Sequence, residues 1–133
     1  MEENVKAANA YSAPVLAYIG DSFFELLTRE RIVNGGNCNI SDLSAESKKF
    51  VTAVSQSAAA ERILPLLTAE EEAVYIKGRN AKTNHTPRSA RSAEYHRATG
   101  LETLFGWLYI CGRTDRARQI FDLCFPKETE EKT

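Results

Sequence analysis

The chain has 133 residues, of which 43% are hydrophobic and 26% are charged, and its net charge at pH 7 is −1. This composition is typical of one globular domain and excludes an intrinsically disordered chain. The near-neutral charge means that nucleic-acid binding would need a local basic patch. No apolar run is long enough to span a membrane. Residues 1–4 include Glu2 and Glu3 and do not resemble a secretory signal or a basic transit peptide, so we expect a cytoplasmic protein with no membrane partner.

Periodicity predicts helices along the whole chain. We expect a polar, frayed lead-in over residues 1–9, one domain over residues 10–126 and a charged tail over residues 127–133. Ser12 is the predicted N-cap of a helix that ends near Arg31. Its predicted apolar side consists of Val15, Leu16, Ile19, Phe23, Leu26 and Leu27. Asp21 lies on the other side, which other apolar and small residues interrupt, so we expect this acid to have little water-facing surface.

A second helical stretch is predicted from about Ser41 to Leu67, after the turn residues 34–37, with Pro65 as a point where it bends or ends. Thr68 then opens a capping box, which predicts the start of the next helix. We expect Gly112 to end the helix that follows the basic residues 77–91, and Thr114 to cap the last helix. No segment alternates as a strand does, so we predict a single all-α domain.

The three cysteines, Cys38, Cys111 and Cys124, are far apart and form no CxxC pair. Cys111 and Cys124 lie in apolar helical patterns, which predicts buried thiols. His85 and His96 have no partner at the spacing of metal ligands. We therefore expect a reducing environment and no zinc site.

Residues 98–112 are apolar, small or hydroxylic, with Glu102 as their only charged residue. A helix that is apolar nearly all round is a buried helix, and ionised carboxylates are rarely buried without a partner. Two interpretations stay open at this point. Glu102 lies at the helix rim or pairs with an Arg, or it meets Asp21, the second acid in a similar setting.

Two carboxylates that lie close together repel each other, so a proton or a cation has to lie between them. Mg²⁺ prefers oxygen ligands and keeps several waters, so one or two carboxylates hold it. Residues 77–91 hold five basic residues and no acid, as docking of a phosphate backbone requires. Together these features indicate a metal-assisted phosphodiesterase with Asp21 and Glu102 as metal ligands.

Three segments resemble known motifs. Residues 17–25, which read Ala-Tyr-Ile-Gly-Asp-Ser-Phe-Phe-Glu, resemble the signature helix of the ribonuclease III family, which centres on Leu-Gly-Asp. Residues 99–109 are similar to the second acidic helix of the family, and residues 78–82, Gly-Arg-Asn-Ala-Lys, are similar to a stretch typical of its Mini-ribonuclease III branch. The likeness runs in order from about residue 10 to residue 125. We expect no double-stranded-RNA-binding domain, as in that branch.

The resemblance implies an all-α ribonuclease III-type domain that forms a homodimer and cleaves double-stranded RNA, leaving 5′-phosphate and 3′-hydroxyl ends. Asp21 matches the catalytic aspartate of the family, and Glu102 matches the glutamate that ligates the catalytic Mg²⁺, for which we expect Mn²⁺ to substitute. The resemblance further implies maturation of the precursor of 23S ribosomal RNA, with a ribosomal protein as a possible partner that presents this substrate.

Two positions depart from the full-length family pattern. Ala17 and Thr99 stand where full-length enzymes have acids, as in the Mini-ribonuclease III branch. We therefore expect one well-held Mg²⁺ at the site, with Glu25 and Thr99 supporting its ligands from outside. The missing acids also motivate an alternative, a non-catalytic RNA-binding or ribosome-associated scaffold. The apolar first helix motivates another, a plain helical dimer module.

The predicted RNA contacts are Arg79, Asn80, Lys82, Arg88 and Arg91. One alternative is that these residues form a solvated basic loop with no special role. Another is that Asn80 or Lys82 orients one of the carboxylates. Because double-stranded RNA offers few exposed base faces, we expect the aromatic residues to lie in the core or at a dimer interface. These residues are Tyr18, Phe23, Phe24 and Trp107.

Overall fold

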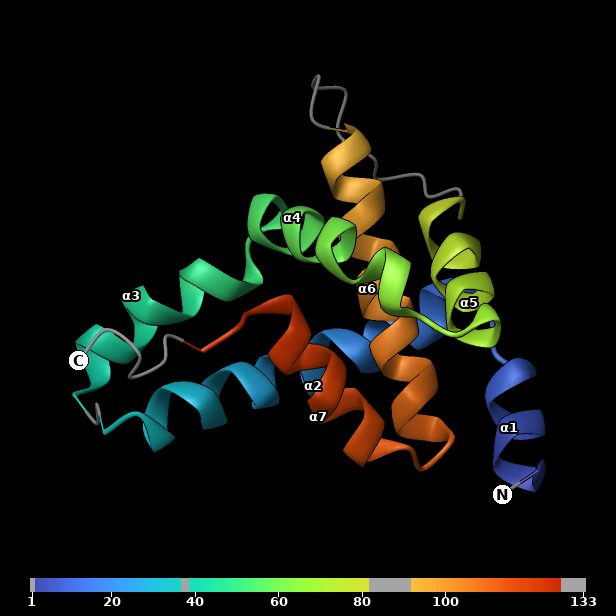
Figure 1. Ribbon diagram of the computed structural model, residues 1–133, viewed down its shortest axis with the longest axis horizontal. Coiled ribbons are helices and arrows are strands. Elements are labelled where there is room, and N and C mark those ends of the chain that lie inside the picture. The colour runs from blue at the N-terminus through green and yellow to red at the C-terminus, as the bar shows by residue number, and fades with distance from the viewer. Residues whose placement is uncertain (1, 37–38, 82–91, 128–133) are drawn as a thin grey trace.

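The structure is a computed structural model that describes residues 2–36, 39–81 and 92–127. Within these ranges the chain is helical and has no strand, which confirms the predicted all-α class (Figure 1). The elements are α1 (Glu2–Asn9), α2 (Ala13–Asn34), α3 (Ile40–Val51), α4 (Ala53–Ile63), the short 3₁₀ helix η1 (Leu64–Leu66), α5 (Ala69–Arg79), α6 (Ser92–Ile110) and α7 (Thr114–Cys124).

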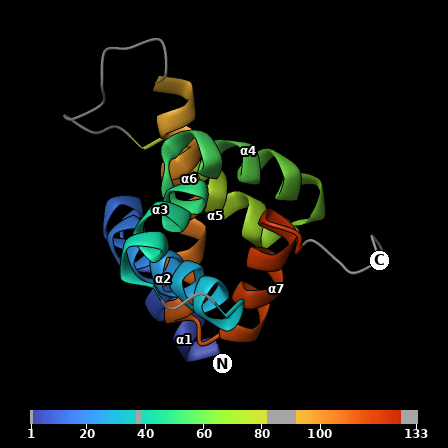
Figure 2. The ribbon, with the colours of Figure 1, turned by 90° about the vertical axis from the view of Figure 1, so that its left-hand side faces the viewer.

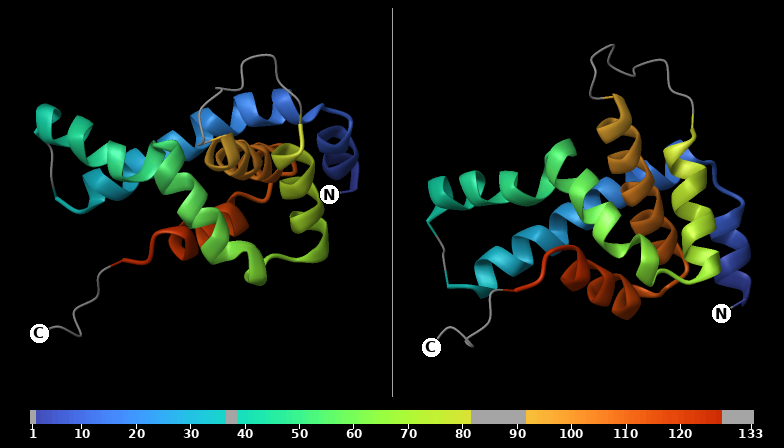
Figure 3. Two further views of the ribbon diagram at one scale, coloured as in Figure 1. Left: turned by 90° about the horizontal axis from the view of Figure 1, so that it is seen from above. Right: turned by 45° about the horizontal axis from the view of Figure 1, so that its top comes forward.

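The central element is α6, which contacts α1, α2, α4, α5 and α7. Seen from above, α2 lies on one side of α6, and α4 and α5 lie on the other (Figure 3). The view from the side places α7 below α4 (Figure 2). Leu101, Phe105 and Leu108 of α6 are fully buried, which confirms the prediction of a buried helix. Gly112, whose φ of 78° lies in the left-handed region, follows the last turn, as predicted.

The limits of α2 follow its sequence. The Ser12 hydroxyl accepts a hydrogen bond from the Val15 amide at 3.4 Å, which confirms the predicted N-cap. The predicted apolar side was partly wrong, because Val15 and Leu26 are 45% and 52% exposed whereas Phe24 is fully buried. Since α2 has apolar residues almost all round, periodicity alone did not identify the side on which α6 packs.

The single long helix predicted after the turn is wrong. Thr52 has extended backbone angles, φ −71° and ψ 156°, and separates α3 from α4. Its hydroxyl accepts a hydrogen bond from the Ser55 amide at 3.2 Å, so it acts as the N-cap of α4. Threonine favours this position because its hydroxyl satisfies a free amide of the first turn.

The predicted frayed lead-in is also wrong, because residues 2–9 form α1. The Asn9 side chain accepts a hydrogen bond from the indole N–H of the buried Trp107 at 2.8 Å, and Ala8 is fully buried. A buried indole N–H needs such an acceptor, and α1 supplies it. At the other end of the chain, the N-cap of α7 is Arg113 and not the predicted Thr114, and no side chain caps this helix.

Cys111 and Cys124 are buried free thiols, as predicted, while Cys38 lies outside the described residues. No helix in the described part of the chain has the length and apolar character that crossing a bilayer requires.

A buried ion pair joins α5 to α7. Glu71, at position N3 of the predicted capping box, has a side chain that is only 4% exposed. Arg116 places Nε and Nη2 at 2.8 Å from the two carboxylate oxygens of Glu71. Burial by itself raises the pKa of Glu71, but hydrogen bonds from Arg116 and Thr68 and the charge of Arg116 bring it below its ordinary value of 4.5.

We predict that Arg116→Ala lowers the free energy of unfolding by about 3 kcal/mol at pH 7, because it leaves a buried carboxylate without its partner. The control is Arg29→Ala, which removes the exposed Arg29–Glu25 pair and should cost less than about 1 kcal/mol. Urea denaturation measures both free energies of unfolding.

The same variant has a predicted pH dependence. Because the folded pKa of Glu71 is lowered, the stabilisation by the Glu71 carboxylate is present above pH 4.5 and is lost as the pH falls through the folded pKa. The loss of unfolding free energy in Arg116→Ala should therefore shrink in acid. Equal losses in the two variants at pH 7 would contradict this account.

Candidate active site

The site begins with a backbone contact between α2 and α6. A Cβ atom added to Gly20 would lie 1.7 Å from the carbonyl oxygen of Glu102, and one added to Gly106 would lie 1.9 Å from that of Leu16. Only hydrogen fits at these two positions, so the helices cross with their backbones in contact (Figure 1). Asp21 follows Gly20 directly, and the crossing therefore brings it to Glu102.

Asp21 and Glu102, the acid pair, lie within hydrogen-bonding distance of each other. Glu102 is partly buried, whereas Asp21 is exposed, which corrects the expectation that Asp21 has little water-facing surface. Burial, the charge of Asp21 and the hydrogen bond to Asp21 raise the pKa of Glu102 to about 8, although a hydrogen bond from Gln56 acts in the opposite direction. At pH 7 Glu102 therefore holds a proton that it shares with the Asp21 carboxylate.

No cation balances the acid pair in the part of the chain that the structure describes. The ion pairs found there join other acids to Arg or Lys, and none includes Asp21 or Glu102. The described residues therefore give no support to the interpretation in which Glu102 pairs with an Arg. They place no Lys or Arg in an ion pair with either acid.

The donor set fits a hard divalent cation. Two adjacent carboxylates offer oxygen ligands, and Mg²⁺ accepts one or two of these while it keeps several waters. Within residues 2–36, 39–81 and 92–127, no three His, Cys, Asp or Glu side chains cluster in a way that would bind a metal. The site therefore suits Mg²⁺ better than Zn²⁺, which takes His and Cys ligands.

Glu25 and Thr99, which we expected to support the metal ligands, lie on α2 and α6 with the acid pair. Their side chains form hydrogen bonds to other groups. Glu25, one turn beyond Asp21, accepts a hydrogen bond from Arg29 at 2.7 Å. The hydroxyl of Thr99 donates to the carbonyl of Tyr95 at 3.1 Å and so binds its own helix. Their supporting roles stay predictions.

Gln56 of α4 is the residue that sequence reasoning missed. Its side chain is 3% exposed and hydrogen-bonds to the Glu102 carboxyl. A buried amide signals a polar partner, but nothing in the sequence shows that α4 packs on α6 at this point.

Arg79 and Asn80 lie at the end of α5, where Asn80 is the C-cap and accepts a hydrogen bond from Arg79 at 3.3 Å. Gly78 packs against Thr103, the neighbour of Glu102, so the last turn of α5 is held close to the acid pair. The remaining predicted RNA contacts, Lys82, Arg88 and Arg91, lie outside the described residues, as does His85.

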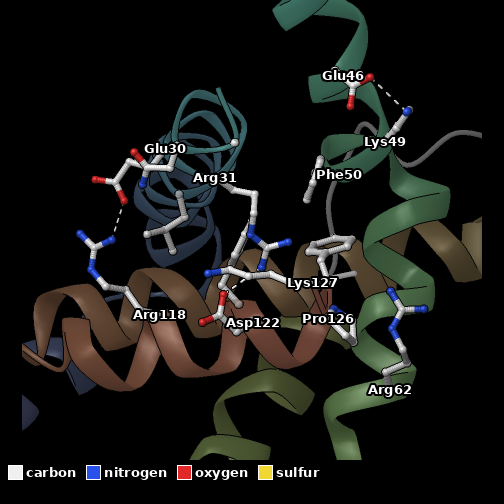
Figure 4. A pocket seen from close by; sticks show the side chains of 15 residues that line it. Glu30, Arg31, Glu46, Lys49, Phe50, Arg62, Arg118, Asp122, Pro126 and Lys127 are labelled. Carbon is white, nitrogen blue, oxygen red and sulfur yellow. Dashed lines mark hydrogen bonds and ion pairs between the residues drawn. The ribbon is translucent and has the colours of Figure 1, made fainter. Parts of the chain in front are cut away.

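A cavity of about 910 Å³ lies elsewhere, between α2, α3 and α7 (Figure 4). Its charged side chains bind one another, as Arg31 does with Asp122 at 2.8 Å and Lys49 does with Glu46 at 3.1 Å. Neither member of the acid pair lines this cavity, so it is separate from the candidate active site.

The chain is similar to proteins of one known family. Residues 14–113 match the family described as Ribonuclease III domain. The chain is 37% identical over 118 residues to a Mini-ribonuclease 3 of Symbiobacterium thermophilum, covering 87% of this chain and 91% of that relative. It is 39% identical over 109 residues to a Mini-ribonuclease 3 of Thermoanaerobacter sp., covering 82% and 77%. A crystal structure of protein FN1578 from Fusobacterium nucleatum is similar, with a TM-score of 0.75, 32% identity and coverage of 85% and 90%.

We predict that Glu102→Gln stabilises the metal-free protein at high pH. Because the folded pKa of Glu102 is raised from 4.5 to about 8, its contribution is fully present below pH 4.5 and is lost as the pH rises through 8. An amide does not ionise, so the variant should gain about 2 kcal/mol over the wild type at pH 9 and little at pH 4, as measured by urea denaturation with a chelator present. The same difference at both pH values would contradict the shared proton.

Proposed function

Because this chain belongs to the ribonuclease III family and is an endoribonuclease, we propose that it hydrolyses double-stranded RNA with one Mg²⁺ held by Asp21 and Glu102. The observation that carries the proposal is the contact of two carboxylates that no described cation balances. We expect Mn²⁺ to replace Mg²⁺ because it also binds carboxylate and water ligands.

We assign the two acids different roles because they differ in exposure. Glu102 is partly buried beside α4, so it would hold the cation from the protein side and would give up its proton to do so. Asp21 is exposed, so it would be the ligand on the side from which an RNA phosphate approaches the cation. A Mg²⁺ ion held there would supply an activated water and would offset charge on the phosphoryl oxygens. Attack on the phosphorus with departure of the 3′ oxygen leaves a 5′-phosphate and a 3′-hydroxyl.

RNA docking requires a local positive charge, since the whole chain carries a net charge of −1. We assign this role to the segment that starts at the end of α5, with Arg79, Asn80, Lys82, Arg88 and Arg91 as phosphate contacts. Support comes from Gly78, which packs against Thr103. Because of this contact, the basic segment begins beside the turn of α6 that carries Glu102.

A homodimer is the second part of the proposal. The outward face of α2 and the chain that precedes it carry a row of exposed apolar side chains, namely Tyr11, Val15, Tyr18, Leu26 and Val33, with Tyr109 of α6 also exposed. A soluble protein rarely leaves such a row in water. A second copy of this chain covers it, and a duplex then contacts one acid pair from each subunit, with each site cutting one strand.

The substrate and setting rest on likeness to the Mini-ribonuclease 3 relatives. On that basis we propose the precursor of 23S ribosomal RNA as the substrate, a ribosomal protein as a possible partner that presents it, and a cytoplasmic location. The alternative function, a non-catalytic RNA-binding scaffold, is motivated by Ala17 and Thr99, which stand one turn before Asp21 and Glu102 where full-length enzymes have acids.

We predict that Glu102→Gln lowers cleavage of a duplex RNA by roughly a thousandfold, equivalent to about 4 kcal/mol in the barrier, because an amide does not anchor the cation. RNA binding should change little. Single-turnover cleavage with and without Mg²⁺ measures the effect, with Glu72→Gln on the exposed side of α5 as the matched control. Absence of any Mg²⁺-dependent cleavage by the wild type, together with duplex binding, would favour the scaffold.

We predict that Leu26→Lys raises the dissociation constant of the dimer by about a hundredfold, because it places a charge within the buried apolar face. Sedimentation velocity at micromolar concentration measures this change. Val54→Lys is the control, since Val54 is 54% exposed like Leu26 but lies on α4. A monomeric wild type, or equal dissociation in the two variants, would rule out this interface.

A further inference from the structure

Gln56 is a buried polar residue to which the proposed reaction assigns no role. Its side chain is 3% exposed and meets the Glu102 carboxyl where α4 packs on α6. We propose that Gln56 is a positioning residue whose amide N–H donates to Glu102 and holds that carboxyl in the orientation that binds the divalent cation. This inference rests on the proposed function, because it assigns a role at the same metal site.

The backbone of Gln56 is fixed by the start of α4. The Thr52 hydroxyl caps the helix through the Ser55 amide at 3.2 Å, and the Thr52 carbonyl accepts a hydrogen bond from the Gln56 amide at 2.9 Å. The side chain therefore leaves the first turn of α4 from a fixed point. A buried amide without a hydrogen-bond partner is destabilising, which favours the side-chain conformation in which Gln56 bonds to Glu102.

A neutral donor suits this position. A Lys or Arg at Gln56 would fill the positive site that the acid pair leaves open, and a third acid would add to the repulsion between Asp21 and Glu102. The amide engages the Glu102 carboxyl without neutralising it, so the other lone pairs stay available to a cation. Groups that orient metal ligands in this way typically change metal affinity by about tenfold to a hundredfold when they are lost.

The neighbouring residue offers a matched control. Ser57 is 4% exposed, and its hydroxyl accepts a hydrogen bond from Arg97 of α6 at 3.0 Å. It is a buried polar contact between the same two helices that does not involve Glu102. Ser57→Ala therefore measures what loss of an α4–α6 hydrogen bond costs by itself.

The test is a calorimetric titration of the metal-stripped, RNA-free protein with Mn²⁺, on the wild type and on Gln56→Met, Gln56→Asn, Ser57→Ala and Glu102→Gln. Met keeps the length of the side chain without its donors, and Asn keeps the amide but is shorter by one methylene. We expect both Gln56 variants to bind Mn²⁺ about tenfold to a hundredfold more weakly, and Ser57→Ala to match the wild type. If the Met variant does not fold, as judged by its helical circular dichroism, the Asn variant decides.

Cleavage gives the second readout. The Mg²⁺ concentration for half-maximal cleavage should rise in the Gln56 variants by the factor seen in the titration, while the rate at saturating Mg²⁺ stays near that of the wild type. A merely structural role predicts no such separation.

The outcomes are distinguishable. Wild-type affinity for Mn²⁺ in both Gln56 variants, with binding lost in Glu102→Gln, overturns the positioning role and leaves the proposed function standing. A loss in Ser57→Ala as large as that in Gln56→Met assigns the effect to helix packing and also overturns the role. A wild type that binds no Mn²⁺ overturns both.

Discussion

The contact between the backbones of α2 and α6 is the constraint on which the rest of the structure depends. At Gly20 and Gly106 any side chain larger than hydrogen would overlap the backbone of the partner helix. Interiors pack too densely to absorb such an overlap without moving the helices apart. Asp21 lies on one of these helices and Glu102 on the other. The short distance between the two backbones therefore also sets the distance between the two acids. Fold and chemistry are thus fixed by one contact.

The acid pair differs from Glu71, a buried acid elsewhere in the described part of the chain. Glu71 is held by Arg116 on both carboxylate oxygens, and its pKa is lowered as a result. Glu102 has an acid and an amide as its polar neighbours, and its pKa is raised to about 8. A fold selected for stability alone would pair this carboxyl with a cation. Carboxylates with shifted pKa values cluster at functional sites. Here the repulsion between two adjacent carboxylates lowers stability, and the same two carboxylates are the ligands that a site for a divalent cation requires.

The sequence predicted the helical class and the burial of α6 from local pattern, and motifs identified Asp21 and Glu102 as candidate site residues. It did not predict what depends on contacts between distant segments. Phe24 is buried because α6 packs on that side of α2. Asn9 of α1 bonds to Trp107, which is 98 residues away in the chain, and Gln56 meets Glu102 because α4 packs on α6. The exposure of Asp21 was missed for the same reason, since an apolar neighbourhood along the chain says little about which face other helices cover.

The most direct measurement of the central claim is a crystal structure of the protein soaked in Mn²⁺, with anomalous diffraction recorded at the manganese edge. The account predicts one anomalous peak at the crossing of α2 and α6, with carboxylate oxygens of both Asp21 and Glu102 about 2.0–2.3 Å from the ion. Manganese bound elsewhere, or carboxyl groups too far apart to share it, would contradict the account and leave the ribonuclease III fold without the metal site proposed for it.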